Sequence, residues 1–146
     1  MSIEENKAIL YRWFGMEDFR DLPEAELQKT MRKVISELFD SNFVMHTPEG
    51  DMPLEAYLQY TLGMMAAFPD VSFSVDDTVA EGDKVASRFT IRGTHQGPYR
   101  GTPATRKKVD VSGIVIVRYA SGKCVEVWRY TNTLGMMQQL GVIPSP

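Results

Sequence analysis

The chain has 146 residues, 43% of them hydrophobic and 24% charged, and a net charge of −3. That length is typical of one domain. The mild acidity argues against a nucleic-acid-binding protein, and the basic cluster at residues 100–108 is interpreted as a solvated loop. No apolar run approaches the roughly 20 residues that cross a bilayer, and the polar first residues are unlike a secretory signal. One cysteine and two histidines exclude a disulfide framework and an all-histidine metal centre, although a mixed site with carboxylates stays open. We expect a cytoplasmic, metal-free protein with a single domain over residues 1–146.

The first half of the chain carries helical signals. Ser2 and Glu5 have the spacing of a capping box, and the apolar face that follows continues to Phe14. Pro23 suits the first turn of a second helix, whose apolar stripe reaches Phe39. Further elements are expected as a short strand over residues 43–47, a loop over 48–51 and a third helix over 54–68.

From Val71 onward, apolar and polar residues alternate with the period of two that is typical of strands. Glycine-containing turns are predicted at residues 81–83 and 121–122. The stretch 114–117 is apolar on both faces, which is typical of a central strand. The expected strands cover residues 71–75, 84–92, 107–119 and 123–131.

The order of these elements indicates a fold class. A short helix over residues 134–140, ended by Gly141, closes the chain. Helices followed by strands in hairpins imply an α+β domain with an antiparallel sheet. A long curved sheet with helices on one face forms a cone, and the inside of a cone is a natural apolar ligand pocket.

Several short motifs of the second half occur in a characteristic order. The clearest are Phe68-Pro69-Asp70, Gly93-Thr94-His95-Gln96-Gly97 and Glu126-Val127-Trp128. The others lie at residues 80–85, 101–105, 111–114, 122–123 and 134–141. In this order and spacing they resemble the SnoaL-like polyketide cyclases, within the nuclear-transport-factor-like and ketosteroid-isomerase-like cone fold. The resemblance is close over residues 68–143 and loose over the first three helices, and it implies a curved antiparallel sheet wrapped on helices, as in a cystatin-like α+β barrel.

The resemblance also implies a function. It indicates cofactor-free acid–base chemistry on a small, mostly apolar carbonyl compound: an aldol cyclisation, an isomerisation or a dehydration. Enzymes of this kind hold a carboxylate or a histidine in an apolar cavity, where its pKa shifts toward the working pH. The resemblance further implies a homodimer formed through the outer face of the sheet. Two alternatives stay open, namely a non-catalytic binder of small hydrophobic ligands and a protein–protein adaptor.

The final strand departs from the family's usual pattern. Where the family has a histidine and two aspartates, this chain has Val127, Arg129 and Asn132. Asparagine cannot act as a base, but Asn132 can donate to an oxyanion, or it can cap the last helix. Arg129 is interpreted as pairing with an acid across a dimer, with binding of an anionic substrate as the alternative. These departures are the basis for the non-catalytic alternative.

The two histidines are the candidates for proton transfer. His46 lies where the family often has a histidine followed by an acid, and it titrates near neutrality, so it is the first candidate for a base at the cavity mouth. His95 matches the family's Gly-Thr-His-x-Gly stretch at a strand end. For each, the alternative is a structural histidine that is hydrogen-bonded to the neighbouring loop.

The remaining candidates are ligand-binding residues. Trp128 and Tyr130 share a strand face with Glu126, because side chains on a strand alternate between its faces. If this face points inward, the aromatic rings stack on a planar ligand and Glu126 is the only carboxylate that the strand supplies. Trp13 and Tyr57 on the helices are predicted to close the cavity. Core packing is the alternative for all the aromatic residues.

Overall fold

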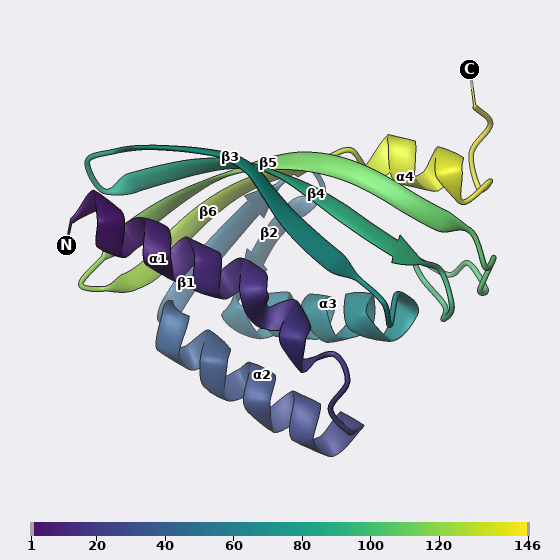
Figure 1. Cartoon of the computed structure of the whole chain (residues 1–146), viewed down its shortest axis with the longest axis horizontal. Coiled ribbons are helices and arrows are strands. Elements are labelled where there is room, and N and C mark those ends of the chain that lie inside the picture. The colour runs from purple at the N-terminus through teal and green to yellow at the C-terminus, as the bar shows by residue number, and fades with distance from the viewer. Residues whose placement is uncertain (1, 146) are drawn as a thin grey trace.

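The structure, a computed structural model, describes residues 2–145, apart from the side chain of Glu17. Its helices are α1 (Ile3–Phe14), α2 (Glu24–Leu38), α3 (Leu54–Ala67) and the short α4 (Thr133–Gln139), with a 3-10 turn η1 (Gly15–Phe19) after α1. Its strands are β1 (Phe39–Thr47), β2 (Gly50–Pro53), β3 (Ser72–Glu81), β4 (Lys84–Thr94), β5 (Lys108–Ala120) and β6 (Lys123–Thr131). Figure 1 shows α1, α2 and α3 on one side of the sheet. None of the helices within residues 2–145 is long and apolar enough to cross a membrane.

The strands form one sheet in the order β2-β1-β6-β5-β4-β3. Neighbouring strands run antiparallel, as predicted, except β1 and β6, which run parallel with His46 beside Trp128. The sheet is therefore mixed rather than antiparallel. No tight turn joins β1 to β6, so nothing in the local sequence fixes their relative direction.

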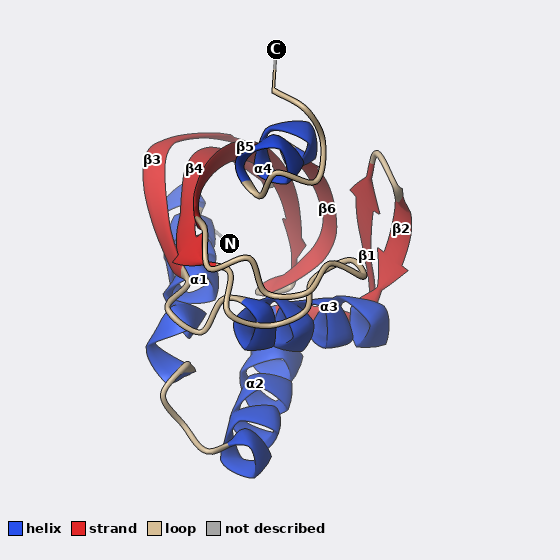
Figure 2. Ribbon diagram, turned by 90° about the vertical axis from the view of Figure 1, so that its right-hand side faces the viewer, coloured by secondary structure: helices blue, strands red, loops and turns tan. Residues whose placement is uncertain are grey.

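The sheet curves around the helices without closing on itself. Figure 2 shows β3 to β6 as an arc, with α1 and α3 on its concave side. The two ends of the arc are β3 and the β1–β2 hairpin. Buried side chains of α1, α2 and α3 form one hydrophobic cluster with those on the concave face. This is the α+β cone that the order of the elements predicts.

Local sequence signals account for the ends of two helices. The Ser2 hydroxyl accepts a hydrogen bond from the Glu5 backbone N–H at 3.1 Å and the Glu5 carboxylate accepts one from the Ser2 N–H, so the predicted capping box is present. At the other end of the chain, Gly141 has a φ of +79° and donates to the Gln138 carbonyl, while Val142 donates to the Met137 carbonyl. This is the Schellman arrangement that glycine favours.

The structure differs from the prediction around β1. Helix α2 ends at Leu38, and Phe39 is the first residue of β1 rather than the last of the helical stripe. The polar residues that follow lie inside this strand, where its pairing with β6 shifts register between Phe39 and Val44. A bulge of this kind tolerates polar residues within a strand. Gly50 was expected in a loop but begins β2, paired with Thr47.

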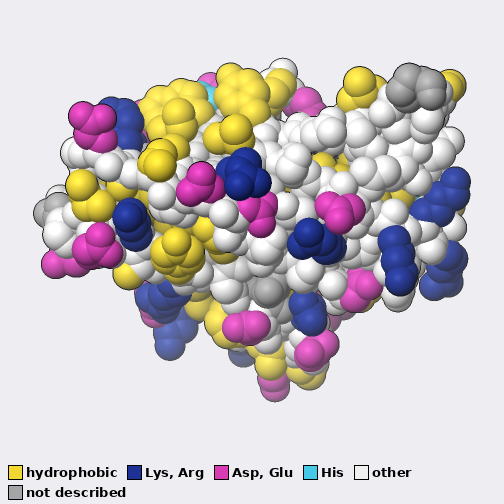
Figure 3. Space-filling model, turned by 45° about the horizontal axis from the view of Figure 1, so that its top comes forward, with side chains coloured by type: hydrophobic (Ala, Val, Ile, Leu, Met, Phe, Trp, Pro, Cys, Tyr) yellow, Lys and Arg dark blue, Asp and Glu magenta, His cyan; other side chains and the backbone are white. Residues whose placement is uncertain are grey.

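Strand β5 lies in the middle of the sheet, as predicted, but only one of its faces is buried. Valines from Val109 to Val117 point inward at alternate positions. Ile114 and Ile116 point outward and are 52% and 40% exposed. Figure 3 shows hydrophobic side chains gathered on this outer face. We call the exposed set the outer apolar patch: Val79, Ile114, Ile116 and Tyr130.

Candidate active site

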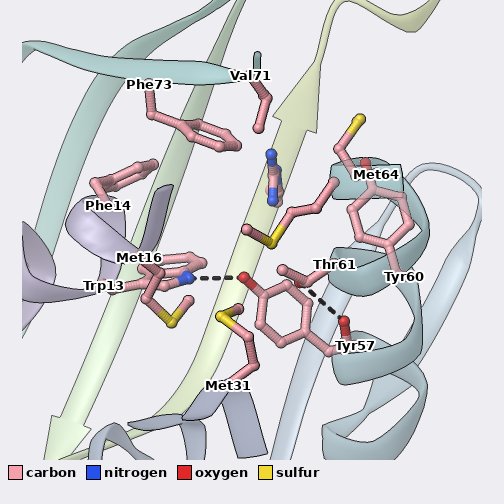
Figure 4. Close-up of a pocket in the computed structure, with 12 residues that line it drawn as sticks. Trp13, Phe14, Met16, Met31, Tyr57, Tyr60, Thr61, Met64, Val71 and Phe73 are labelled. Carbon is pink, nitrogen blue, oxygen red and sulfur yellow. Dashed lines mark hydrogen bonds between the residues drawn. The ribbon is translucent and has the colours of Figure 1, made fainter. Parts of the chain in front are cut away.

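An inner cavity lies between the helices and the concave face of the sheet. Its aromatic walls are Trp13, Phe14, Tyr57, Tyr60 and Phe73. Four methionines complete much of the lining: Met16, Met31, Met64 and Met65. Figure 4 shows these rings and thioethers converging from α1, η1, α2, α3 and β3. The cavity of ≈ 40 Å³ holds about three waters, and flexible methionine side chains allow it to widen around a ligand.

A hydrogen bond between two predicted residues fixes one wall of this cavity. Trp13 Nε1 donates to the Tyr57 hydroxyl at 2.7 Å, and the Thr61 hydroxyl donates to the Tyr57 carbonyl at 3.0 Å (Figure 4). Burial raises the pKa of Tyr57 above its ordinary value, although the positive charge of Arg129 acts in the opposite direction. The Tyr57 hydroxyl therefore stays protonated at neutral pH. Trp13 and Tyr57 both line the cavity, and both are also buried members of the hydrophobic core.

Arg129 is the charged residue of the cavity lining. Its side chain comes from β6 and is only 7% exposed. Nε donates to the Thr131 hydroxyl at 3.3 Å, and the guanidinium lies 5.1 Å from the centroid of the Phe89 ring. Phe89 fits here because Gly113 has no side chain: a Cβ would lie 2.5 Å from the ring. Within the described residues no carboxylate pairs with Arg129, whose contacts are the Thr131 hydroxyl and the Phe89 ring.

A second, more polar hollow adjoins the inner cavity and shares Tyr60 and Arg129 with it. We call this hollow of ≈ 210 Å³ the vestibule. The β1–β2 turn, the loop over residues 97–103 and the start of α4 surround it. Its polar lining includes Thr47, Glu49, Asp51, Tyr60, Arg100, Arg129, Thr131 and Thr133.

An ion pair joins two of the loops around the vestibule. The Arg100 guanidinium binds both carboxylate oxygens of Glu49, at 2.5 and 2.9 Å. This contact lowers the pKa of Glu49 and raises that of Arg100. Arg100 has a φ of +50°, which follows from the tight turn that aims its side chain across the vestibule. The sequence indicated only loops for both residues, with Arg100 in the basic cluster interpreted as a solvated loop, because their pairing depends on how two distant loops meet.

His46 lies on the outer face of the sheet and lines neither the inner cavity nor the vestibule. Its Nε2 lies 2.6 Å from the Glu126 carboxylate and its Nδ1 lies 2.9 Å from that of Asp51. Arg118 in turn donates to Glu126 at 3.1 Å. Hydrogen bonding to Glu126 and then to Asp51 raises the pKa of His46, so the imidazole is biased toward its protonated form. This geometry does not provide the predicted base at the cavity mouth.

His95 and Asn132 have structural roles in the folded chain, as a buried histidine hydrogen-bonded to a loop and as a helix cap. His95 is fully buried, stacks on Phe68 and accepts a hydrogen bond at Nδ1 from the Thr105 backbone N–H at 3.1 Å. Its Nε2 has no hydrogen-bond partner within the described residues. Asn132 caps α4, since its side-chain oxygen accepts from the Gly135 N–H at 2.9 Å. Neither side chain lines the inner cavity.

The alternation along β6 is opposite to the one predicted. Val127 and Arg129 point inward, whereas Glu126, Trp128 and Tyr130 lie on the outer face. These three residues therefore do not form a stacking platform inside the cone. Arg129, which we expected to pair across a dimer, instead lines the cavity. The sequence contained one signal for the cavity that was overlooked: Tyr57, Tyr60, Thr61 and Met64 share one face of a helix at spacings of three and four.

The described side chains include no group of three or more histidines, cysteines, aspartates or glutamates arranged to hold a metal ion. The fold and the inner cavity together define an α+β cone protein with an internal site. The sequence model of the SnoaL-like polyketide cyclases matches residues 18–140. The chain belongs to the SnoaL-like polyketide cyclase family, which confirms the resemblance seen in its motifs.

Solved structures share this fold over nearly the whole chain. AclR, a proposed hydroxylase from Streptomyces galilaeus, is 26% identical with a TM-score of 0.80 over 99% of this chain and 86% of its own. IdmH, a proposed polyketide cyclase from Streptomyces antibioticus, is 26% identical with a TM-score of 0.73 over 97% of this chain and 99% of its own. A proposed SnoaL-like polyketide cyclase from Jannaschia sp. CCS1 has a TM-score of 0.82 at 20% identity, over 99% of this chain and 98% of its own. No curated protein matches the chain.

Proposed function

We propose that this protein takes a small, mostly apolar carbonyl compound into the inner cavity and polarises its carbonyl oxygen with Arg129. The observation that carries this proposal is a buried guanidinium without a carboxylate partner among the described residues, in a cavity otherwise lined by aromatic and methionine side chains. Family membership supports carbonyl chemistry, because the family is described as polyketide cyclases. Aldol cyclisation and isomerisation both proceed through an enolate, whose oxygen gains negative charge. The described lining of the inner cavity holds no carboxylate or imidazole, so the proton leaves carbon to water or hydroxide while Arg129 stabilises the oxyanion.

The position of Arg129 suits the stabilisation of such an oxyanion. A cation that is held out of water interacts with a developing negative charge far more strongly than a solvated one does. The protonated Tyr57 hydroxyl lies on the same cavity wall and supplies a second donor. Aromatic and methionine side chains bind the apolar body of the ligand with few directional demands.

One observation favours a second candidate function. The described side chains of the inner cavity include no carboxylate and no imidazole that could remove a proton from carbon. A protein with such a lining binds and orients a carbonyl compound without turning it over. This candidate corresponds to the ligand-binding alternative that the missing aspartates suggested.

Exchange of carbon-bound protons tests both candidates. The wild type and Arg129→Met are incubated with 2-tetralone in D₂O, and deuterium at the carbons beside the ketone is followed by NMR. We expect the wild type to accelerate exchange and Arg129→Met to lose about 10²-fold of that acceleration, which is typical of removing one oxyanion donor. Arg106→Met, an exposed arginine outside both hollows, is the matched control.

The outcomes separate the two candidates. Binding of 2-tetralone without accelerated exchange contradicts the enzymatic proposal and supports the binding protein. Absence of binding contradicts both, and it is measured by fluorescence in a Trp128→Phe variant, where Trp13 in the cavity wall is the remaining tryptophan. Mass spectrometry of small molecules that co-purify with the wild type but not with Arg129→Met then identifies the natural ligand class.

A further inference from the structure

The vestibule extends the inner cavity toward the protein surface. Tyr60 and Arg129 line both hollows, so these two side chains stand where the inner cavity and the vestibule meet. The two hollows differ in chemistry, because the inner one is aromatic and sulfur-rich while the outer one is lined by hydroxyl and charged groups. A molecule that fills both therefore has an apolar body and a polar end.

The charged side chains of the vestibule lining are two carboxylates, Glu49 and Asp51, and two guanidiniums, Arg100 and Arg129. Glu49 pairs with Arg100, and Asp51 lies 2.9 Å from His46 Nδ1 on the outer face. Arg129 is more than nine-tenths buried and has no carboxylate partner within the described residues. The two guanidiniums are therefore the cationic contacts open to a ligand, Arg129 where the hollows meet and Arg100 inside the vestibule.

The Glu49–Arg100 pair shows where a carboxylate fits. The guanidinium of Arg100 holds both oxygens of the Glu49 carboxylate, which is the geometry that arginine offers to any carboxylate. The Arg100 and Glu49 side chains are 35% and 52% exposed, and ion pairs with this exposure add little stability. Glu49 can therefore leave for solvent at small cost when another carboxylate takes its place.

We propose that the vestibule is a carboxylate subsite, in which the carboxylate of the ligand replaces Glu49 on Arg100 while the apolar body occupies the inner cavity and its carbonyl group faces Arg129. This inference rests on the proposed function of the inner cavity. It assigns the ligand to the apolar keto acids, bound as free acids rather than as esters. It also makes Glu49 an internal competitor that covers the subsite when no ligand is present.

Three related probes test this subsite by isothermal titration calorimetry. They are 3-benzoylpropionic acid, its methyl ester and butyrophenone, which keeps the aryl ketone but has no carboxyl group. We expect the wild type to bind the acid at least about tenfold more tightly than the ester, as a charge-assisted bidentate pair provides. Arg100→Gln removes this preference by weakening the acid alone. Glu49→Gln strengthens binding of the acid several-fold and leaves the ester unchanged.

Arg106→Gln is the control, because this exposed arginine on the same segment lines neither hollow; it should alter no affinity. Equal affinities for acid and ester, with butyrophenone also bound, overturn the subsite and leave the proposed function of the inner cavity standing. If none of the three probes binds, that function fails and the subsite fails with it. Should Arg100→Gln not fold, an unchanged affinity of Glu49→Gln for the acid is enough to overturn the proposal.

Discussion

Replacing Arg129 by methionine should make the ligand-free protein more stable. Methionine has similar length and suits a cavity that already contains four methionines. Desolvating a charge without a partner costs several kcal/mol, and the substitution removes that cost. Against this stand the contact with Phe89, worth up to about 2 kcal/mol, and the hydrogen bond to Thr131, worth about 1 kcal/mol.

Replacing buried charged groups by apolar residues of similar volume is often neutral or stabilising by about 1–4 kcal/mol, so with these two losses we expect a gain of roughly 1–2 kcal/mol in the free energy of unfolding. For a chain of 146 residues, such a gain raises Tm by about 3–6 °C. Urea denaturation and calorimetry of the ligand-free protein measure both quantities. Arg106→Met should stay within about 0.5 kcal/mol of the wild type, because it changes an exposed side chain.

A lower Tm for Arg129→Met would refute the reasoning, because it would mean that the guanidinium is already compensated in the folded chain. The same substitution is expected to abolish stabilisation by the keto acid, since a ligand stabilises only a protein that binds it. A substitution that raises stability but abolishes ligand binding indicates a residue that serves function at the expense of stability.

Three further predictions concern the outer face and the end of the chain. The pKa of His46 is raised in the folded chain, so its ion pairs stabilise the fold fully below the ordinary histidine pKa, and this stabilisation is lost as the pH rises through the folded pKa. In urea denaturation, His46→Gln should therefore lower the free energy of unfolding more at pH 6 than at pH 9. We propose that the outer apolar patch joins two copies of the chain, so the wild type should elute as a dimer in size-exclusion chromatography with light scattering and Ile116→Glu as a monomer; a monomeric wild type contradicts this. Asn132→Ala should lower the free energy of unfolding by about 1 kcal/mol, and an unchanged value would mean that its cap does not contribute.

Local signals predicted the elements of this fold well. The bounds of β6, the capping box of α1 and the glycine end of α4 all follow from residues that are neighbours in sequence. The parallel pairing of β1 with β6 does not, because it depends on which distant strands meet in space. Pairing of this kind is decided by burial over the whole chain rather than by turns.

The candidate site was predicted only in part, for a reason visible in β6. Each face of this strand carries both apolar and charged residues. One face has Val127 and Arg129, and the other has Glu126, Trp128 and Tyr130. Aromatic residues favoured the second face as the inner one, yet a single register step exchanges the two faces. The pairing of Val127 with Val117 on β5 fixes the correct face, and that information is absent from β6 alone.

The place of β6 in the sheet has a consequence for how the chain reaches its folded form. The last strand in the sequence lies between β5 and β1, so the β1–β2 hairpin has no contact with the rest of the sheet until β6 has been inserted. On the ribosome, β1 therefore emerges with an unpaired edge and keeps it until nearly the whole sheet has been synthesised. Long-range pairing of this kind slows folding and leaves an open edge that invites pairing with other chains. The polar residues at the bulge of β1, Asp40 to Asn42, disfavour pairing of this open edge with other chains until β6 has been synthesised.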